Sequence, residues 1–266
     1  MLRVARIGLI TIAIGSSVPE RARAEGRPTQ LADHKPEAKD TALELELGLF
    51  ARGGAFFTPH IDVRYAPSAH AELTFEWPIQ IALASGAGVA SGNPSAALYY
   101  MKRGQDGYFR IGGGFGLPLA PRDQLALPMN GMRDAWTYWP KALSFLVPAQ
   151  LEIQRGALVL GGDFAGGAMI PVGTGTGATQ IALQIAGLIG GRIRKVTLGT
   201  RLQGAWLPKV PGDNAQVALV PFVQGDFSDG GFLYARFTLN LDKPYGLFGN
   251  GAEGVWGLFI GGGSRQ

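Results

Sequence analysis

The residue types that most often carry out catalysis are scarce in this chain. It contains three histidines, His34, His60 and His70, and no cysteine. His60 and His70 flank a predicted turn at Pro67 without occupying mirror positions of a hairpin, so a catalytic dyad or a shared metal ion is not expected. The motifs G-x-S-x-G and H-E-x-x-H and an acidic calcium loop are absent. We therefore expect no enzyme, no metal site and no cofactor.

One stretch that could suggest ligand binding is the glycine-threonine run at 173–177. It lacks the lysine of a P-loop and does not lie between a strand and a helix, so nucleotide binding is not expected. The surrounding residues 164–191 carry no formal charge and are long enough to cross a membrane as a helix. Their many glycines and Pro171 disfavour a helix, and a hairpin with the run as its turn is expected instead.

The first 24 residues have the pattern of an export signal. Arg3 and Arg6 precede an apolar stretch at 7–14, and Ala22-Arg23-Ala24 forms an A-x-A cleavage site. The apolar stretch is far shorter than the ~20 residues of a membrane-spanning helix, so we expect cleavage rather than a retained anchor. Residues 25–41 are polar and aperiodic and are expected to form a flexible leader.

The net charge bears on the class of partner. The whole chain has 24 Lys and Arg against 20 Asp and Glu. Removing the predicted signal takes away four arginines and one glutamate, which leaves 20 basic and 19 acidic residues. A mature chain with a net charge near +1 is not expected to bind nucleic acid.

Composition favours strands over helices. Forty-one glycines and seventeen prolines interrupt the chain, and no segment between them keeps a helical period. Only 17% of the residues are charged, against about 25% in typical soluble domains. Part of the surface is therefore expected to face something other than water.

The strongest signal is an alternation of apolar and polar residues with a period of two. It is clearest over 71–83, where every second residue from Ala71 to Leu83 is apolar. The same alternation occurs at 42–52, 196–206 and 233–242. A period of two places successive side chains on opposite faces of a strand, so each segment is expected to have one apolar face.

Similar stretches predict twelve strands. Their ranges are 42–52, 55–66, 69–84, 95–103, 107–119, 144–155, 157–171, 178–190, 193–207, 215–227, 230–243 and 252–262. Several are about as long as a tilted strand that crosses a bilayer, whereas soluble strands usually have about five or six residues. An even number of strands returns both chain ends to one side of a membrane. The prediction is an all-β fold, a closed antiparallel transmembrane β-barrel of about twelve strands over 42–266, with ten to fourteen also compatible with the pattern.

The longest gap between predicted strands is 120–143, which contains three prolines and the aromatic cluster Trp136, Tyr138 and Trp139. We expect an extracellular loop there, because barrel loops are long on that side. Trp206, Tyr245 and Trp256 fall near predicted strand ends, where aromatic side chains would meet the membrane interface. Trp77 lies in the middle of a strand and fits that pattern less well.

These features together resemble bacterial outer-membrane β-barrel proteins as a class. The export signal, the long alternating strands and the final segment Gly254-Val255-Trp256-Gly257-Leu258-Phe259-Ile260 carry the resemblance. It implies a location in the bacterial outer membrane, with membrane lipid and the barrel-assembly machinery as partners. The chain departs from the class pattern because it continues past Phe259 to Gly-Gly-Gly-Ser-Arg-Gln rather than ending in an aromatic residue.

The alternation assigns each strand an outward and an inward face. The candidate lipid-facing residues are Leu43, Leu45, Leu47, Phe75, Ile79, Ile81, Leu198, Leu202, Phe237 and Leu239. The candidate pore-lining residues are Glu44, Glu46, Arg64, Glu72, Glu76, Arg110, Glu152, Asp163, Arg201, Arg236 and Asp242. Mixed charges at this density indicate either paired charges that bridge a narrow lumen or a narrow water-filled pore for a small solute.

A different function class also fits the alternation. A soluble periplasmic or secreted β-barrel would bury the apolar face around an apolar ligand and expose the charged face. The direction of the apolar face therefore separates the two classes. The oligomeric state and the identity of a solute do not follow from the sequence.

Overall fold

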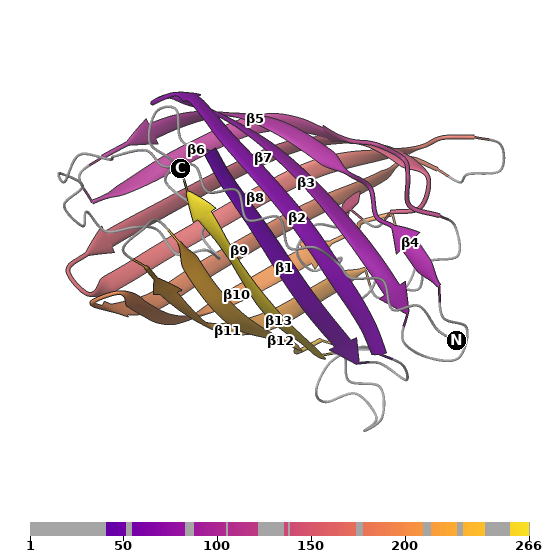
Figure 1. The fold of residues 1–266 in the computed structure, drawn as a ribbon. Helices are drawn as coiled ribbons and strands as arrows, with labels where there is room; N and C mark the ends of the chain where they lie inside the picture. The colour runs from indigo at the N-terminus through magenta and orange to yellow at the C-terminus, as the bar shows by residue number, and fades with distance from the viewer. Residues whose placement is uncertain are drawn as a thin grey trace, which may run out of the picture.

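The computed structural model describes residues 41–51, 55–82, 88–104, 106–121, 136–137, 139–173, 178–209, 214–227, 231–242 and 256–265. The predicted signal at 1–24 and residues 25–40 of the predicted leader lie outside the described residues, as does Tyr245. The described regular structure is almost entirely β-strand (Figure 1). Among the described residues, no helix is both long enough and apolar enough to cross a membrane.

Thirteen strands are present in the described part of the chain. They are β1 (Thr41–Ala51), β2 (Ala55–Ser68), β3 (Ala71–Ala82), β4 (Val89–Ser91), β5 (Ser95–Arg103), β6 (Gly107–Gly116), β7 (Ala142–Arg155), β8 (Leu158–Pro171), β9 (Gln180–Ile193), β10 (Val196–Trp206), β11 (Ala215–Asp226), β12 (Phe232–Asn240) and β13 (Trp256–Arg265). Twelve of them correspond to the twelve predicted ranges, with ends that differ by a few residues. The short β4 was not predicted, because three residues are too few for an alternation to be recognised. The prediction of an all-β antiparallel fold is confirmed.

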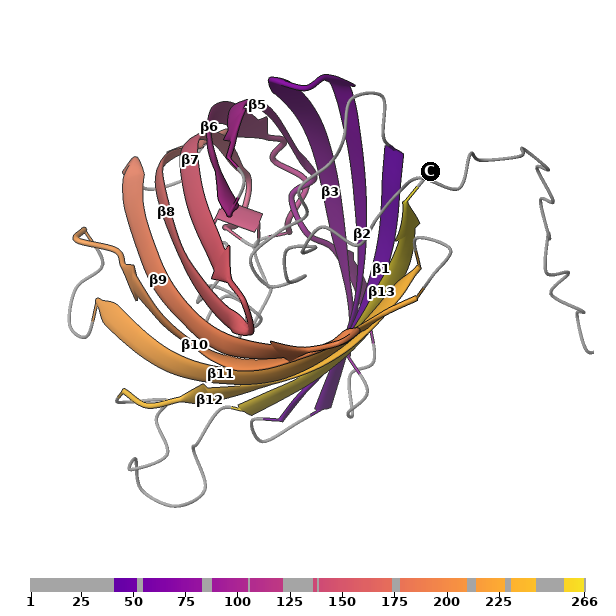
Figure 2. The same ribbon diagram turned by 90° about the vertical axis from the view of Figure 1, so that its left-hand side faces the viewer.

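Neighbouring strands pair in antiparallel fashion throughout. The order in the sheet is β2-β1-β13-β12-β11-β10-β9-β8-β7-β6-β5-β3-β4, with a further pairing between β2 and β3. The pairing of β1 with β13 is long and regular, from Ala42 opposite Arg265 to Ala51 opposite Trp256. The pairing of β2 with β3 runs from Phe56 opposite Ala82 to Ser68 opposite Ala71. Viewed along its length, the sheet curls around a central space (Figure 2).

The connections between strands differ in length at the two ends of the sheet. At one end, here called the short-turn end, the turns are brief: residues 69–70, 104–106, 156–157, 194–195 and 227–231. At the other end, the long-loop end, most connections are longer, including 117–141, 207–214 and 241–255. Thr41 and Arg265, the first residue of β1 and the last of β13, both lie at the short-turn end, next to the ends of their partner strands.

Two of the short turns have the backbone geometry of tight hairpins. Gly156 and Arg194 both have positive φ angles, 56° and 55°. Positive φ at this position matches the twist of the flanking strands and suits glycine, whereas Arg194 adopts it without that freedom. Each of these turns also accepts a hydrogen bond from the end of a neighbouring strand. The Arg192 amide of β9 donates to the Ala157 carbonyl at 2.6 Å, and the Asp226 amide of β11 donates to the Lys195 carbonyl at 2.8 Å.

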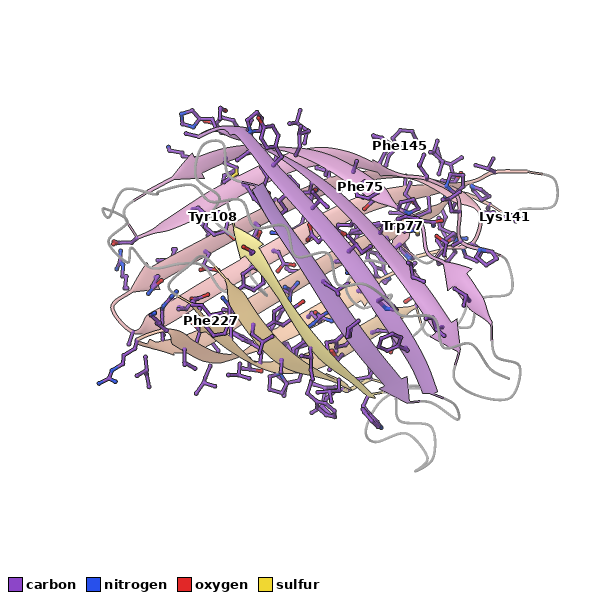
Figure 3. The ribbon with its side chains drawn as sticks, in the orientation of Figure 1. Phe75, Trp77, Tyr108, Lys141, Phe145 and Phe227 are labelled. Carbon is purple, nitrogen blue, oxygen red and sulfur yellow. The ribbon has the colours of Figure 1, made fainter. Side chains whose placement is uncertain are left out.

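The two faces of the sheet have opposite polarity. Large apolar side chains such as Phe75 and Phe145 are exposed on the convex side, here called the outer face (Figure 3). Buried polar and charged side chains, including Glu72, Arg110 and Gln224, lie on the concave side, here called the inner face. The two-residue period of the sequence therefore places the exposed apolar side chains on the outer face and the charged side chains on the inner face.

Candidate functional site

The inner face holds charged side chains in pairs. Arg64 on β2 contacts Asp62 of the same strand at 2.6 Å. Arg192 on β9 contacts Asp226 on β11, also at 2.6 Å, near the short-turn end. Two further ion pairs, here called the deep pairs, join Arg110 to Glu72 and Arg201 to Asp163. Pairing of this kind is what makes buried charges tolerable, because an isolated one loses its hydration without compensation.

Arg110 on β6 is the centre of a network across four strands. Its guanidinium Nη1 bonds the Oε1 of Glu72 on β3, a side chain that is fully buried at 0% exposure. Its Nε donates to the Oε1 of Gln150 on β7 at 2.7 Å. Its Cζ lies 4.2 Å from the ring centroid of Tyr99 on β5, a cation–π distance. One arginine thus connects side chains of β3, β5 and β7.

The second deep pair has the same layout on the next part of the sheet. Arg201 on β10 donates from Nη2 to the Oδ1 of Asp163 on β8 at 2.7 Å, and β9 lies between the two strands. Arg236 on β12 lies with its Cζ 4.1 Å from the ring centroid of Phe259 on β13. Guanidinium groups of the inner face therefore contact carboxylates or aromatic rings from neighbouring strands.

A further polar residue anchors the connection between β6 and β7. Asn93, just before β5, is fully buried at 0% exposure. Its Nδ2 donates to the carbonyls of Trp136 at 2.8 Å and Trp139 at 2.7 Å, and its Oδ1 accepts from the Ala120 amide at 2.7 Å. Its own amide donates to the Thr137 carbonyl at 2.6 Å. A single side chain thus ties both ends of this connection to the sheet.

The anchored connection carries Trp136 inward. Its side chain is only 5% exposed and packs in a cluster with Ala142, Leu146, Met169 and Ala182 on β7, β8 and β9. The sequence predicted a loop at 120–143 but did not indicate that Trp136 packs against the strands. Residues 122–135 lie outside the described residues, so the extracellular position expected for the loop stays a prediction.

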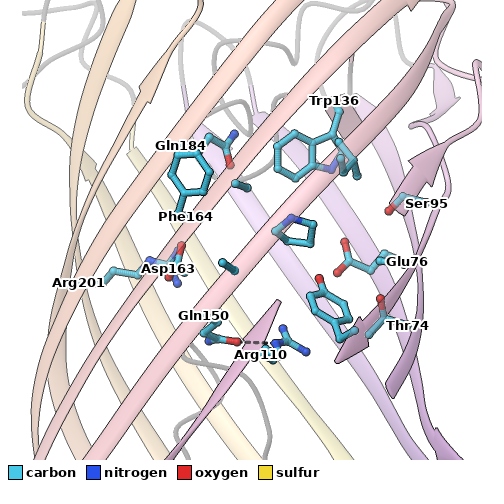
Figure 4. A pocket seen from close by; sticks show the side chains of 16 residues that line it. Thr74, Glu76, Ser95, Arg110, Trp136, Gln150, Asp163, Phe164, Gln184 and Arg201 are labelled. Atoms are coloured by element: carbon cyan, nitrogen blue, oxygen red, sulfur yellow. Dashed lines mark hydrogen bonds and ion pairs between the residues drawn. The ribbon is translucent and has the colours of Figure 1, made fainter. Parts of the chain in front are cut away.

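A cavity of about 90 Å³ lies between the two deep ion pairs and beneath Trp136 (Figure 4). It is lined by residues from β3, β5, β6, β7, β8, β9, β10 and the anchored connection. The lining residues that bear functional groups are Thr74, Glu76, Ser95, Tyr99, Arg110, Trp136, Gln150, Asp163, Gln184 and Arg201. Figure 4 shows Asp163 and Arg201 on one side of the space and Glu76 on the other. The cavity is therefore lined by charges of both signs, amides, hydroxyls and three aromatic residues, Tyr99, Trp136 and Phe164.

The predicted pore-lining residues fall mostly on the inner face. Arg64, Glu72, Arg110, Glu152, Arg201 and Arg236 are buried, and Glu76, Asp163 and Asp242 are half-buried. Asp242 lies just beyond the end of β12. Only Glu76, Arg110, Asp163 and Arg201 of this set line the cavity. Glu44 and Glu46 lie on β1, but their side chains lie outside the described residues.

The predicted lipid-facing residues that are described fall on the outer face. Leu45, Leu47, Phe75, Leu198 and Leu202 are exposed, and Ile79, Ile81, Phe237 and Leu239 are half-buried. The side chain of Leu43 lies outside the described residues. Whether any of these residues touches lipid or lines a conducting pore stays a prediction.

The aromatic residues predicted at strand ends lie at the long-loop end. Trp206 is the last residue of β10 and Trp256 the first of β13, and both are exposed. Trp77, the exception in the middle of β3, is also exposed and donates its indole N–H to Ser91 Oγ on β4 at 2.9 Å. The short β4 thus supplies the partner that an indole on an apolar face requires.

Sequence reasoning missed two features of this site. Asn93 and Trp136 were not candidates, because their importance depends on contacts between residues more than forty positions apart. The Asn93-Pro94 pair indicates a turn but not an anchor.

Metal binding would need several His, Asp or Glu side chains close together. No group of three such side chains in the described ranges is placed to hold an ion.

The fold is similar to solved structures of bacterial outer-membrane proteins. The β-domain of the Bordetella autotransporter BrkA has a TM-score of 0.53 and 11% sequence identity, and covers 86% of this chain and 100% of its own. The translocator domain of the autotransporter NalP from Neisseria meningitidis has a TM-score of 0.46 and 12% identity, covering 89% and 91%. The outer-membrane protein OmpT of Vibrio cholerae has a TM-score of 0.37 and 8% identity, covering 87% and 100%.

Similarity is found at the level of structure alone. No family model matches the sequence, and no curated protein matches it. At 11% identity, the match to the BrkA β-domain concerns the fold and not the activity. The resemblance of this chain to bacterial outer-membrane β-barrel proteins as a class is confirmed.

Proposed function

We propose that this protein is an integral outer-membrane β-barrel whose interior forms a narrow polar passage. The observation that carries the proposal is the inverted polarity of the sheet. Leu202 and Ile185 are 53% and 67% exposed on the outer face, while Glu72 and Arg110 are 0% and 4% exposed on the inner face. A soluble protein gains stability by the opposite arrangement, with its apolar residues buried.

The same observation disfavours the soluble alternative. A barrel that binds an apolar ligand would need its large aliphatic and aromatic side chains to point inward. Here the exposed apolar side chains extend over all the strands from β1 to β13, whereas the apolar patches of soluble surfaces are isolated. Contact with lipid chains accounts for this area without exposing it to water.

We propose further that the sheet is closed in the membrane. The pairings of β1 with β13 and of β2 with β3 support this, because they leave neither β1 nor β2 with an unpaired long edge. An unpaired edge inside a bilayer would leave backbone N–H and C=O groups without partners, at a cost of several kcal/mol each. The position of Thr41 and Arg265 at the short-turn end supports a periplasmic location of both chain ends, consistent with delivery by a cleaved export signal.

The proposed passage is narrow because ion pairs and rings occupy much of the interior. Arg110 reaches Glu72 across β5, and Arg201 reaches Asp163 across β9. Trp136 covers part of the space between them. Barrels of about eight strands are filled by side chains and those of 16–18 strands hold open channels, so twelve long strands suit a constricted interior.

Two measurements test the proposal in sequence. The mature chain, refolded in detergent, should migrate faster on a gel before heating than after heating, as closed barrels do. Inserted into a planar bilayer, it should give small, stable conductance steps. A folded chain that inserts but never conducts would support a barrel with a structural role and refute the passage. A chain that stays soluble without detergent would refute the membrane assignment itself.

A further inference from the structure

We propose that the cavity beneath Trp136 is a selectivity site that admits small uncharged, hydroxylated solutes and rejects ions. The proposal rests on the polar passage proposed above and adds the class of solute. It is carried by the balance of charge around the cavity, the neutral groups between the charges and the anchored aromatic wall.

Charge around the cavity is balanced. Its lining contains two guanidinium groups, Arg110 and Arg201, and two carboxylates, Glu76 and Asp163. Arg201 is bound to Asp163 at 2.7 Å, and Arg110 is bound to Glu72 behind the lining. An ion in the cavity would meet lining charges of both signs, of which Arg110, Arg201 and Asp163 are already paired, so its lost hydration would not be replaced. A neutral solute has no such cost.

The neutral lining groups suit hydroxyl groups. Thr74, Ser95 and Gln184 each offer both a donor and an acceptor, as a polyol does. Gln184 is only 6% exposed and comes from β9, whereas Thr74 and Ser95 come from β3 and β5 on the opposite part of the sheet. A solute with hydroxyls spaced along a short carbon chain would find partners on both sides.

Trp136 forms an apolar wall of the cavity. Its position is fixed by the buried Asn93, which accepts and donates hydrogen bonds at both ends of the connection. A flat ring beside hydroxyl and amide groups matches the chemistry of polyols and small sugars, whose C–H faces are apolar and whose hydroxyls are polar. The aromatic wall adds contact area for a neutral solute and nothing for a small ion.

The experiment compares solutes that share one carbon skeleton. Uptake into proteoliposomes is measured for erythritol, its carboxylate erythronate and its amine 1-amino-1-deoxyerythritol, after subtraction of protein-free vesicles. Erythritol is expected to enter at least about fivefold faster than either ion, the factor that corresponds to about 1 kcal/mol of hydration lost by the ion and not replaced. Equal entry of all three would overturn the inference and leave the passage standing. Entry of none would overturn both.

Variants test the role of charge balance. Asp163→Asn leaves the charge of Arg201 in excess and should raise erythronate uptake about fivefold, and Arg201→Gln should raise uptake of the amine by a similar factor. The double variant keeps the balance and should keep the preference for erythritol. If either single variant does not fold into a barrel, as judged by heat-modifiable migration on a gel, the double variant still tests the inference.

The Arg192–Asp226 pair supplies a matched control. It joins the same residue types at 2.6 Å, also across one strand, but neither residue lines the cavity. Asp226→Asn and Arg192→Gln should leave the order of the three uptake rates unchanged. Shifts as large as those at Asp163 and Arg201 would show that selectivity does not reside at this cavity, and absence of any shift at Asp163 and Arg201 would overturn the inference equally.

Discussion

Replacing Asn93 with alanine should release the connection between β6 and β7 from the interior and enlarge the passage. The side chain is fully buried and makes three hydrogen bonds, two to the carbonyls of Trp136 and Trp139 and one from the Ala120 amide. No other side chain in the described ranges is seen to bond these three groups. Alanine removes all three bonds without adding bulk.

The size of the effect follows from these bonds. A buried hydrogen bond contributes about 1 kcal/mol net, so three contribute about 3 kcal/mol to the docked position of the connection. At about 1.4 kcal/mol per factor of ten, the population with the connection undocked should rise by about two orders of magnitude. The strands themselves should remain paired, because Asn93 lies outside β4 and β5.

Two assays report on the change independently of each other. Amide hydrogen exchange should become faster at Ala120 and Lys141, whose amides donate to Asn93 Oδ1 and to the Ala120 carbonyl. Single-channel conductance should increase, or become noisy between two levels, because Trp136 no longer holds one position. Exchange tests the anchor even if the protein does not conduct.

Asn240→Ala is the matched control. Asn240 is also buried, at 2% exposure, but its side-chain Nδ2 donates to Gln216 Oε1 at 3.1 Å and not to the connection between β6 and β7. It should lower stability by about 1 kcal/mol without altering exchange at Ala120. Unchanged exchange and conductance in Asn93→Ala, or equal changes in both variants, would refute the role assigned to Asn93.

Two further predictions concern the outer face and the close packing of the strands. Leu202→Arg, in the middle of β10, should lower the stability of the inserted protein by about 2–4 kcal/mol, whereas Ile193→Arg, at the short-turn end, should cost at most about 1 kcal/mol. Denaturant titration in vesicles measures both, and equal costs would argue against a membrane-embedded outer face. A Cβ at Gly199 would lie 2.6 Å from Phe222 Cζ, so Gly199→Ala should destabilise by about 1–3 kcal/mol. Gly187→Ala, with nothing within 4 Å of its Cβ, should be neutral or slightly stabilising in the same titration.

The strands and their facing could be predicted from the sequence because both depend on local pattern. Alternation over 71–83 specified β3 and placed Phe75 outward and Glu72 inward without knowledge of any partner strand. A shift of one residue would reverse both assignments, but a long alternating segment fixes the facing because many positions must agree with it. The turn residues indicated antiparallel pairing, because a short hairpin places two consecutive strands side by side in opposite directions.

The site depends on contacts that no local pattern contains. Which carboxylate Arg110 selects is decided by the stagger of β3, β5 and β6, and the sequence shows only that several acids alternate with several bases. The inward position of Trp136 likewise depends on Asn93, which precedes it by more than forty residues. A connection rich in proline and aromatic residues carries the same composition whether it projects from a barrel or folds into it.

The charges of the inner face are positioned by residues that carry no charge. A Cβ at Gly112 would lie 2.4 Å from the Leu98 carbonyl oxygen and 2.9 Å from Tyr99 Cδ1, so glycine leaves space both for the backbone of β5 and for the Tyr99 ring. Arg110 lies over the same ring at 4.2 Å, and from there reaches Glu72 and Gln150. A side chain at Gly112 should therefore displace the backbone of β5 and the Tyr99 ring, and the Arg110 guanidinium with them. Gly112 thus helps to set where the charge of Arg110 lies in the proposed passage, and its substitution should alter solute selectivity even though no ionisable group is changed.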